Sequence, residues 1–207
     1  EMATPQSTAV TTRLTRGSAP SAISTSAISA TSCAVLRTAC TDGKNLEARE
    51  KMSLASTYAG FAFTRANVGY VHAIAHQFGG LYHTPHGLAN AIMLPFVLKY
   101  SSPAITERLA LLALRAKVGH EDEPSEVLAQ KFLDAVDQLN QDLGIPTCLD
   151  ALREADIPEL AKAACHEAHT SYPVPRYMTQ EVCEDIIRQV LPKAKKPASS
   201  PRRRKAA

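Results

Sequence analysis

The sequence lacks any apolar run close to the ~20 residues that a membrane-spanning helix needs, although 45% of its 207 residues are hydrophobic. We therefore expect one domain with a sizeable core and no membrane partner. It also lacks a C-x-x-C motif. Its cysteines are odd in number and widely spaced, which argues against a disulfide framework and favours free thiols in a reducing, cytoplasmic setting. The five cysteines stand at positions 33, 40, 148, 165 and 183.

Acidic residues are absent from the last fifteen positions, Lys193–Ala207, which carry seven basic side chains. Because the net charge of the whole chain is +3, the other residues carry about −4, and the basic pI belongs to the tail. Such a tail could bind nucleic acid or an anionic surface, or act as a nuclear address. A solvated terminus is the simpler interpretation, so we expect residues 192–207 to be a disordered tail and nucleic acid not to be a partner.

Strand patterns are missing beyond residue 42, where apolar residues recur with a helical period. The fold class that this predicts is all-α, a helical bundle over residues 42–191. Pro95 is expected to kink its helix or end it early, and Thr179 is expected to cap the last one. The first predicted helix ends near residue 64, and the others cover about 68–78, 87–100, a stretch after 103, 126–142, 148–154, 157–170 and 179–191.

Four of the seven histidines fall within one stretch, Gly69–Pro95. His72 and His76 are four residues apart, so on a helix their rings leave the same face one turn from each other. Gly79 and Gly80 are expected to break this helix, and His86 is expected at the start of the next one. The intervening turn can bring the ring of His86 back toward the first two.

Neutral imidazole is a common ligand for transition metals, and rings converging from a helix and a turn suit such a site. The spacing alone does not establish one, because a histidine on a helix is more often a satisfied core or surface residue. Ala73 occupies the glutamate position of H-E-x-x-H, so the metalloprotease hypothesis loses its general base.

The residues of this stretch closely resemble the signature of the iron-containing (group III) alcohol dehydrogenases. The similarity extends outward over residues 43–191, including a preceding helix and a later proline- and arginine-containing turn. The matching segments are Gly69-x-x-His72-Ala-x-Ala-His76-x-x-Gly79, Pro85-His86-Gly87-x-Ala-Asn90-Ala-x-x-Leu-Pro95, Asn45-Leu-Glu-Ala-Arg-Glu-Lys-Met52, Ala59-Gly-Phe-Ala-Phe63, Leu143-Gly-Ile-Pro146, Asp156-Ile-Pro-Glu-Leu160 and Pro173-x-Pro175-Arg176.

This resemblance implies roles for three histidines. His72 and His86 match two of the family's ligands to Fe²⁺, or to Zn²⁺ in some members. His76 matches the histidine beside the nicotinamide and the substrate, which makes it the candidate catalytic and cofactor-binding residue for proton transfer. The family's metal is completed by an Asp and a His from an earlier D-x-x-x-H helix, and a separate N-terminal domain, absent here, holds NAD or NADP. The implied substrate is a small primary alcohol or diol, or its aldehyde.

Residues 1–41 differ from the rest: Ser, Thr and Ala supply 24 of the 41 positions, and Glu1 is the only acid. No helical period is visible there. The segment could be a disordered leader, or a mitochondrial transit peptide, since it is rich in serine and poor in acid. We favour a third interpretation, a corrupted remnant of the ligand-bearing region, in which Thr12 and Arg16 stand where the family has its Asp and His. Arginine stays protonated and cannot replace a metal ligand.

The remaining polar candidates are expected to be minor. His83 is interpreted as a partly exposed loop residue, and His120 as an inert one. His166 and His169 are three apart, but a solvated helix end is favoured over a second metal pair. Asn90 could lie near the metal region or simply cap a turn.

We therefore interpret the sequence as a fragment of a metal-dependent alcohol dehydrogenase that is inactive alone. The alternative is a non-catalytic helical remnant that acts as a binding or interaction module. A homo-oligomer is compatible with either.

Overall fold

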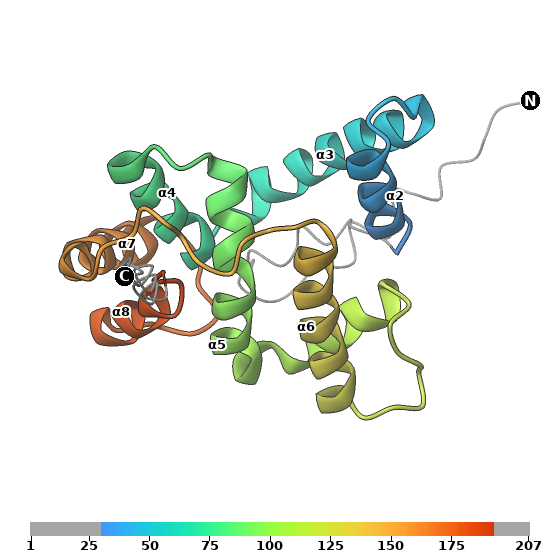
Figure 1. Cartoon of the computed structure of the whole chain (residues 1–207). Coiled ribbons are helices and arrows are strands. Elements are labelled where there is room, and N and C mark those ends of the chain that lie inside the picture. The colour runs from blue at the N-terminus through green and yellow to red at the C-terminus, as the bar shows by residue number, and fades with distance from the viewer. Residues whose placement is uncertain (1–29, 193–207) are drawn as a thin grey trace, which may run out of the picture.

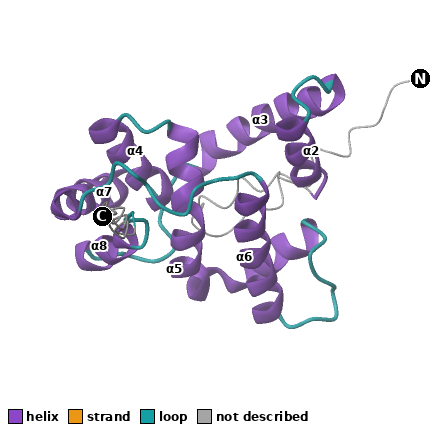
Figure 2. Ribbon diagram, in the orientation of Figure 1, coloured by secondary structure: helices purple, strands orange, loops and turns teal. Residues whose placement is uncertain are grey.

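The computed structural model describes residues 30–192, in which every regular element is helical (Figure 1, Figure 2). The all-α prediction is therefore confirmed. The elements are α2 (Ala30–Thr41), α3 (Leu46–Ala66), α4 (Tyr70–Tyr82), α5 (His86–Arg115), α6 (Ser125–Asp142), the 3₁₀ turn η2 (Glu154–Asp156), α7 (Ile157–Ser171) and α8 (Gln180–Arg188). The predictions for Thr12, Arg16 and the basic tail fall outside these residues.

Two helix boundaries near the histidines differ from the prediction. Gly79 and Gly80 do not break α4, which continues to Tyr82. Each glycine costs a helix about 1 kcal/mol relative to alanine, and the burial of Phe78 in the core outweighs that cost. The helix ends instead at His83, whose left-handed backbone (φ 55°) lets its N–H bond to the carbonyl of Gly79.

Pro95 is buried inside α5, which continues past it, so the prediction that it ends the helix early is wrong. A proline leaves the carbonyl four residues earlier without its helical partner. Here that carbonyl, of Ala91, accepts a hydrogen bond from Asn140 Nδ2 at 2.8 Å. The helical backbone is lost only at Ile105, two residues after Pro103.

Two further differences lie away from the histidines, in residues 30–41 and 148–154. A helix over residues 30–41 was not predicted, and the structure places α2 there. A helix over residues 148–154 was predicted, and the structure has a turn followed by η2. The N–H of Leu149 donates to the carbonyl of Val190 at 2.8 Å, which ties the start of this segment to the residues just after α8. Thr179 caps α8 as predicted, accepting from the N–H of Val182.

The main core lies between α4, the first half of α5, α7 and α8. Its largest fully buried side chains include Phe78, Ile74, Met93 and Ile187. A second cluster joins the rest of α5 to α6 around Leu109 and Leu133. Helix α3 runs from this bundle to α2 as an arm (Figure 1), and only Ala48 and Ala66 of its residues are buried.

Within the described part of the chain, none of the helices has both the length and the apolarity needed to cross a bilayer. The four cysteines whose side chains are described, at positions 40, 148, 165 and 183, are free thiols.

Candidate metal and catalytic site

The fold brings three histidine rings together at the junction of α4 and α5. The ring centroids lie 5.4 Å apart for His72 and His86, 5.3 Å for His76 and His86, and 6.0 Å for His72 and His76. The first two rings come from one face of α4, as their spacing predicted. The turn after His83 reverses the chain, so that α5 begins with His86 beside them.

His72 is half-buried, and its Nδ1 is a buried ring nitrogen with no hydrogen-bond partner. Burial lowers the pKa of His72 below its ordinary value, and the neighbouring rings of His86 and His76 lower it further. The neutral form that these effects favour is the form of imidazole that binds a metal ion.

His86 is exposed and is contacted by Asn90, one helical turn further along α5. The side-chain Nδ2 of Asn90 donates to the carbonyl of His86 at 2.8 Å and faces its ring Nε2 at 3.1 Å. The Oδ1 of Asn90 is buried without a partner. Asn90 therefore lies at the histidine cluster and orients His86. A metal bound through this Nε2 would require Asn90 to release it.

His76 has a carboxylate partner that sequence reasoning missed. Its Nδ1 lies 2.6 Å from Oε1 of Glu167 on α7. The hydroxyl of Tyr172 also donates to Oε1, at 2.6 Å, and Nε2 of Gln77 donates to Oε2 at 3.0 Å. Burial and the Glu167 carboxylate raise the pKa of Tyr172 to about 12. The pairing spans 91 positions, and the only local signal was the place of Glu167 between His166 and His169.

The donor set fits a metal site in part. His72 and His86 present two imidazole rings side by side, which suits a borderline transition metal. Among residues 35–192, however, no three histidine, cysteine or carboxylate side chains are placed to hold one ion. The described residues therefore supply an incomplete set of ligands.

The other histidines lie apart from this cluster. His83 is exposed at the end of α4, as predicted, and His120 lies in a loop. His166 and His169 belong to no group of three or more histidine, cysteine or carboxylate side chains within residues 35–192. His169 is not simply solvated, because its Nε2 bonds to the hydroxyl of Tyr70 at 2.8 Å and its ring stacks on Tyr177.

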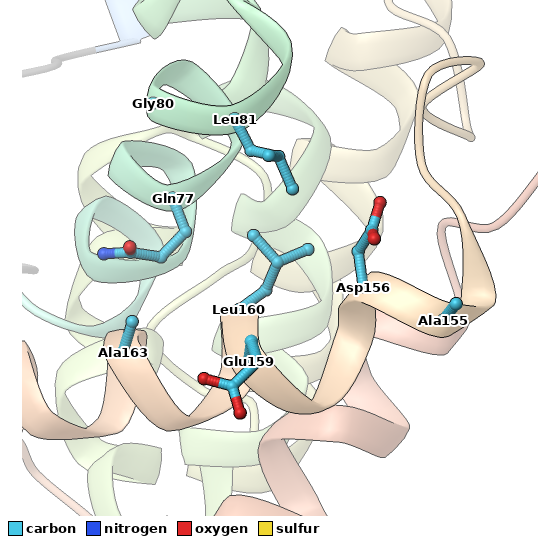
Figure 3. Close-up of a pocket in the computed structure, with 8 residues that line it drawn as sticks. All are labelled: Gln77, Gly80, Leu81, Ala155, Asp156, Glu159, Leu160 and Ala163. Carbon is cyan, nitrogen blue, oxygen red and sulfur yellow. The ribbon is translucent and has the colours of Figure 1, made fainter.

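A cavity of about 520 Å³ lies between α4 and the segment from η2 into α7 (Figure 3). None of the three clustered histidines lines it. Gln77, on its wall, is the residue that also bonds to Glu167. The lining residues are Gln77, Gly80, Leu81, Ala155, Asp156, Glu159, Leu160 and Ala163.

Several known proteins are similar to this chain. It is 42% identical over 156 residues to the 1,3-propanediol dehydrogenase of Klebsiella pneumoniae, covering 74% of this chain and 40% of that protein. It is 40% identical over 153 residues to alcohol dehydrogenase 4 of Saccharomyces cerevisiae, covering 72% of this chain and 38% of that one. The crystal structure of a 1,3-propanediol oxidoreductase superposes with a TM-score of 0.73 at 36% identity, over 82% of this chain and 50% of that chain.

The chain thus spans about two fifths of the length of these curated relatives. The profile of the C-terminal part of the Fe-containing alcohol dehydrogenase family matches residues 20–191. That match includes the whole histidine cluster and every helix that surrounds it. The chain belongs to the iron-containing alcohol dehydrogenase family, and the part of it that the chain carries is the C-terminal one.

Proposed function

We propose that this chain is the metal-binding part of a dehydrogenase that interconverts a small primary alcohol or diol and its aldehyde. The observation that carries the proposal is the pairing of the His72 and His86 rings, with His76 beside them, in a chain of this family. His72 and His86 would hold Fe²⁺, with Zn²⁺ as the alternative. The ion held by these two rings would supply Lewis-acid polarisation of the alcohol or aldehyde oxygen.

His76 is the residue proposed to transfer the proton, next to the nicotinamide of NAD or NADP. Two features suit it to that role. Glu167 holds its Nδ1, which orients the ring, and the side chain is 39% exposed, so a substrate can reach it. Because residues 35–192 present only two of the proposed ligands, we propose that the chain is inactive alone. A cytoplasmic location, expected from its unpaired cysteines, belongs to the same proposal.

A chimera tests this function. The 156 residues of the Klebsiella pneumoniae 1,3-propanediol dehydrogenase that match this chain would be replaced by those of this chain, so that the relative supplies everything else. We expect nicotinamide-linked oxidation of a primary alcohol or diol in the presence of ferrous iron. His72→Ala or His86→Ala should abolish it, and His120→Ala, in a loop away from the cluster, should not.

The incomplete donor set favours one rival, a non-catalytic helical remnant that serves as a binding module. A chimera that folds and binds the nicotinamide nucleotide, yet gives no turnover with ferrous or zinc ions, would overturn the dehydrogenase proposal and support the remnant. Turnover that is unchanged by His72→Ala and by His86→Ala would overturn the assignment of these residues as metal ligands.

A further inference from the structure

Glu167 is the only carboxylate that contacts any of the three clustered histidines within residues 35–192. We propose that Glu167 is a positioning residue: it holds the neutral ring of His76 in the tautomer that carries its hydrogen on Nδ1 and leaves Nε2 free to accept a proton. The inference rests on the proposed function for the use of that proton acceptor, but its geometry is independent of any metal.

Both oxygens of Glu167 are occupied by groups that can only donate toward it. Gln77 Nε2 also donates to the carbonyl of Ala73 at 3.1 Å, so its amide nitrogen, and not its oxygen, must face Glu167. Tyr172, with its raised pKa, keeps its hydroxyl proton and donates as well. An ionised carboxylate is an acceptor at every lone pair. The remaining partner, His76 Nδ1, must therefore also be the donor.

The hydrogen bond between His76 and Glu167 is short and is held in place by packing. The separation of 2.6 Å between Nδ1 and Oε1 is at the short end for a hydrogen bond to a charged group, which is roughly twice as strong as a neutral one. Helices α4 and α7 are packed together by the main core, so both partners are fixed by buried neighbours, among them Ala73 and Ala168. The ring cannot turn over without breaking this contact.

The consequence concerns the opposite edge of the ring. Nδ1 is bonded to Glu167, and the His76 side chain as a whole remains 39% exposed, with its ring stacked on that of His86, so Nε2 is the ring nitrogen left for a substrate. A nitrogen without hydrogen at that position can accept a proton from a bound alcohol, whereas the other tautomer would present an N–H and could not. Glu167 thus selects the ring form that the proposed reaction requires.

Substitution of Glu167 by Ala tests the tautomer, because it removes the carboxylate that His76 Nδ1 bonds to. Without that acceptor, the Nδ1–H form loses the hydrogen bond that favours it over the Nε2–H form. Glu159→Ala is the matched control, since it truncates a glutamate of the same helix at a position whose side chain is 82% exposed.

The measurement is two-dimensional ¹H–¹⁵N NMR of the histidine rings in the full 207-residue chain without added metal, at a pH of about 8.5, roughly two units above the ordinary pKa of histidine. The signals of His76 are identified by their loss in His76→Ala. For the unmodified chain and for Glu159→Ala we expect the Nδ1–H form of His76 in at least about tenfold excess. For Glu167→Ala we expect that excess to be lost.

An unmodified chain whose His76 is mainly in the Nε2–H form would overturn the inference, whether or not the variant folds. A folded Glu167→Ala protein that keeps the excess of the Nδ1–H form would also overturn it, by showing that something other than Glu167 sets the tautomer. Because no metal, cofactor or turnover enters the measurement, its failure is distinct from a failure of the chimera.

Discussion

The histidine-bearing helix α4 and the arm helix α3 are consecutive in the chain and are built in opposite ways. Six of the 13 residues of α4 are buried, whereas only two of the 21 residues of α3 are. Helix α4 packs against α5 and α7, but the main contact of α3 is with α2. The positions of His72 and His76 are therefore set by a core on both sides of their helix, and α3 adds little to that core.

The exposure of the arm helix α3 is not caused by a lack of apolar residues. Residues 52–64 of α3 carry no charge, yet several of their largest side chains remain exposed. Two contacts attach α2 and α3 to the bundle. Arg37 in α2 forms an ion pair with Asp142 in α6, and Asn67, just after α3, donates a hydrogen bond to the carbonyl of Ser171. The difference from α4 teaches that burial, and not hydrophobic composition, decides which helix supports the site. The exposed side chains are Leu54, Tyr58, Phe61 and Phe63.

The largest expected difference between the two regions comes from one phenylalanine in each. Phe78 in α4 is fully buried, and Phe61 in α3 is 70% exposed. We expect Phe78→Ala to lower the free energy of unfolding by about 3–5 kcal/mol, because it removes transfer energy and leaves a cavity. Phe61→Ala should change it by no more than about 0.5 kcal/mol. Urea unfolding followed by circular dichroism measures both, and comparable losses would contradict the distinction.

A smaller effect is expected from Asn140 on α6, which satisfies the carbonyl freed by Pro95. Asn140→Ala would leave the carbonyl of Ala91 without this partner, and we expect a loss of about 1–3 kcal/mol of unfolding free energy. Gln141→Ala, at the neighbouring exposed position, is the control and should be close to neutral. A neutral Asn140→Ala would show that Pro95 is tolerated for some other reason.

The helix caps provide a matched pair of still smaller effects. Thr179 accepts from the N–H of Val182 in α8, and Asn45 accepts from the N–H of Ala48 in α3. Replacing either with Ala should weaken its helix by about 1 kcal/mol. In the core-packed α8 we expect that loss in the global unfolding free energy. In the arm we expect it mainly as faster amide hydrogen exchange within α3. The reverse distribution would mean that the arm unfolds together with the bundle.

The smallest expected effect depends on pH. The hydroxyl of Tyr82 at the end of α4 donates to Asp156 at 2.7 Å, and this bond is the main reason that the pKa of Asp156 lies below its ordinary value. A lowered carboxyl pKa stabilises the fold at pH above the ordinary value of about 3.9, and the contribution is lost as the pH falls through the folded-state pKa. Tyr82→Phe should therefore be less stable than the unmodified chain at neutral pH.

The same comparison at several pH values checks the sign. The difference between Tyr82→Phe and the unmodified chain should shrink as the pH is lowered past the titration of Asp156. A stability difference that stays constant with pH would show that Tyr82 stabilises the fold through packing and not through the Asp156 carboxylate.

The sequence predicted contacts between residues close together in the chain and missed contacts between residues far apart in it. His72, His76 and His86 are brought together by a helix repeat and one short turn, so their spacing predicted the cluster. The continuation of α4 through Gly79 and Gly80 depends on core packing, and that of α5 through Pro95 depends on Asn140, 49 positions away from Ala91. Glu167 is 91 positions from His76. Local periodicity does not record partners of this kind, and so the positioning carboxylate went unpredicted.

The most direct test of the metal-binding assignment is a titration of the 207-residue chain with Ni²⁺, which imidazole binds more tightly than it binds Fe²⁺, followed by broadening of the seven histidine ring signals. We predict that the signals of His72 and His86 broaden first and that this early step is lost in the His72→Ala/His86→Ala double variant. Broadening that begins at His166 and His169, or that affects all seven rings together, would contradict the assignment.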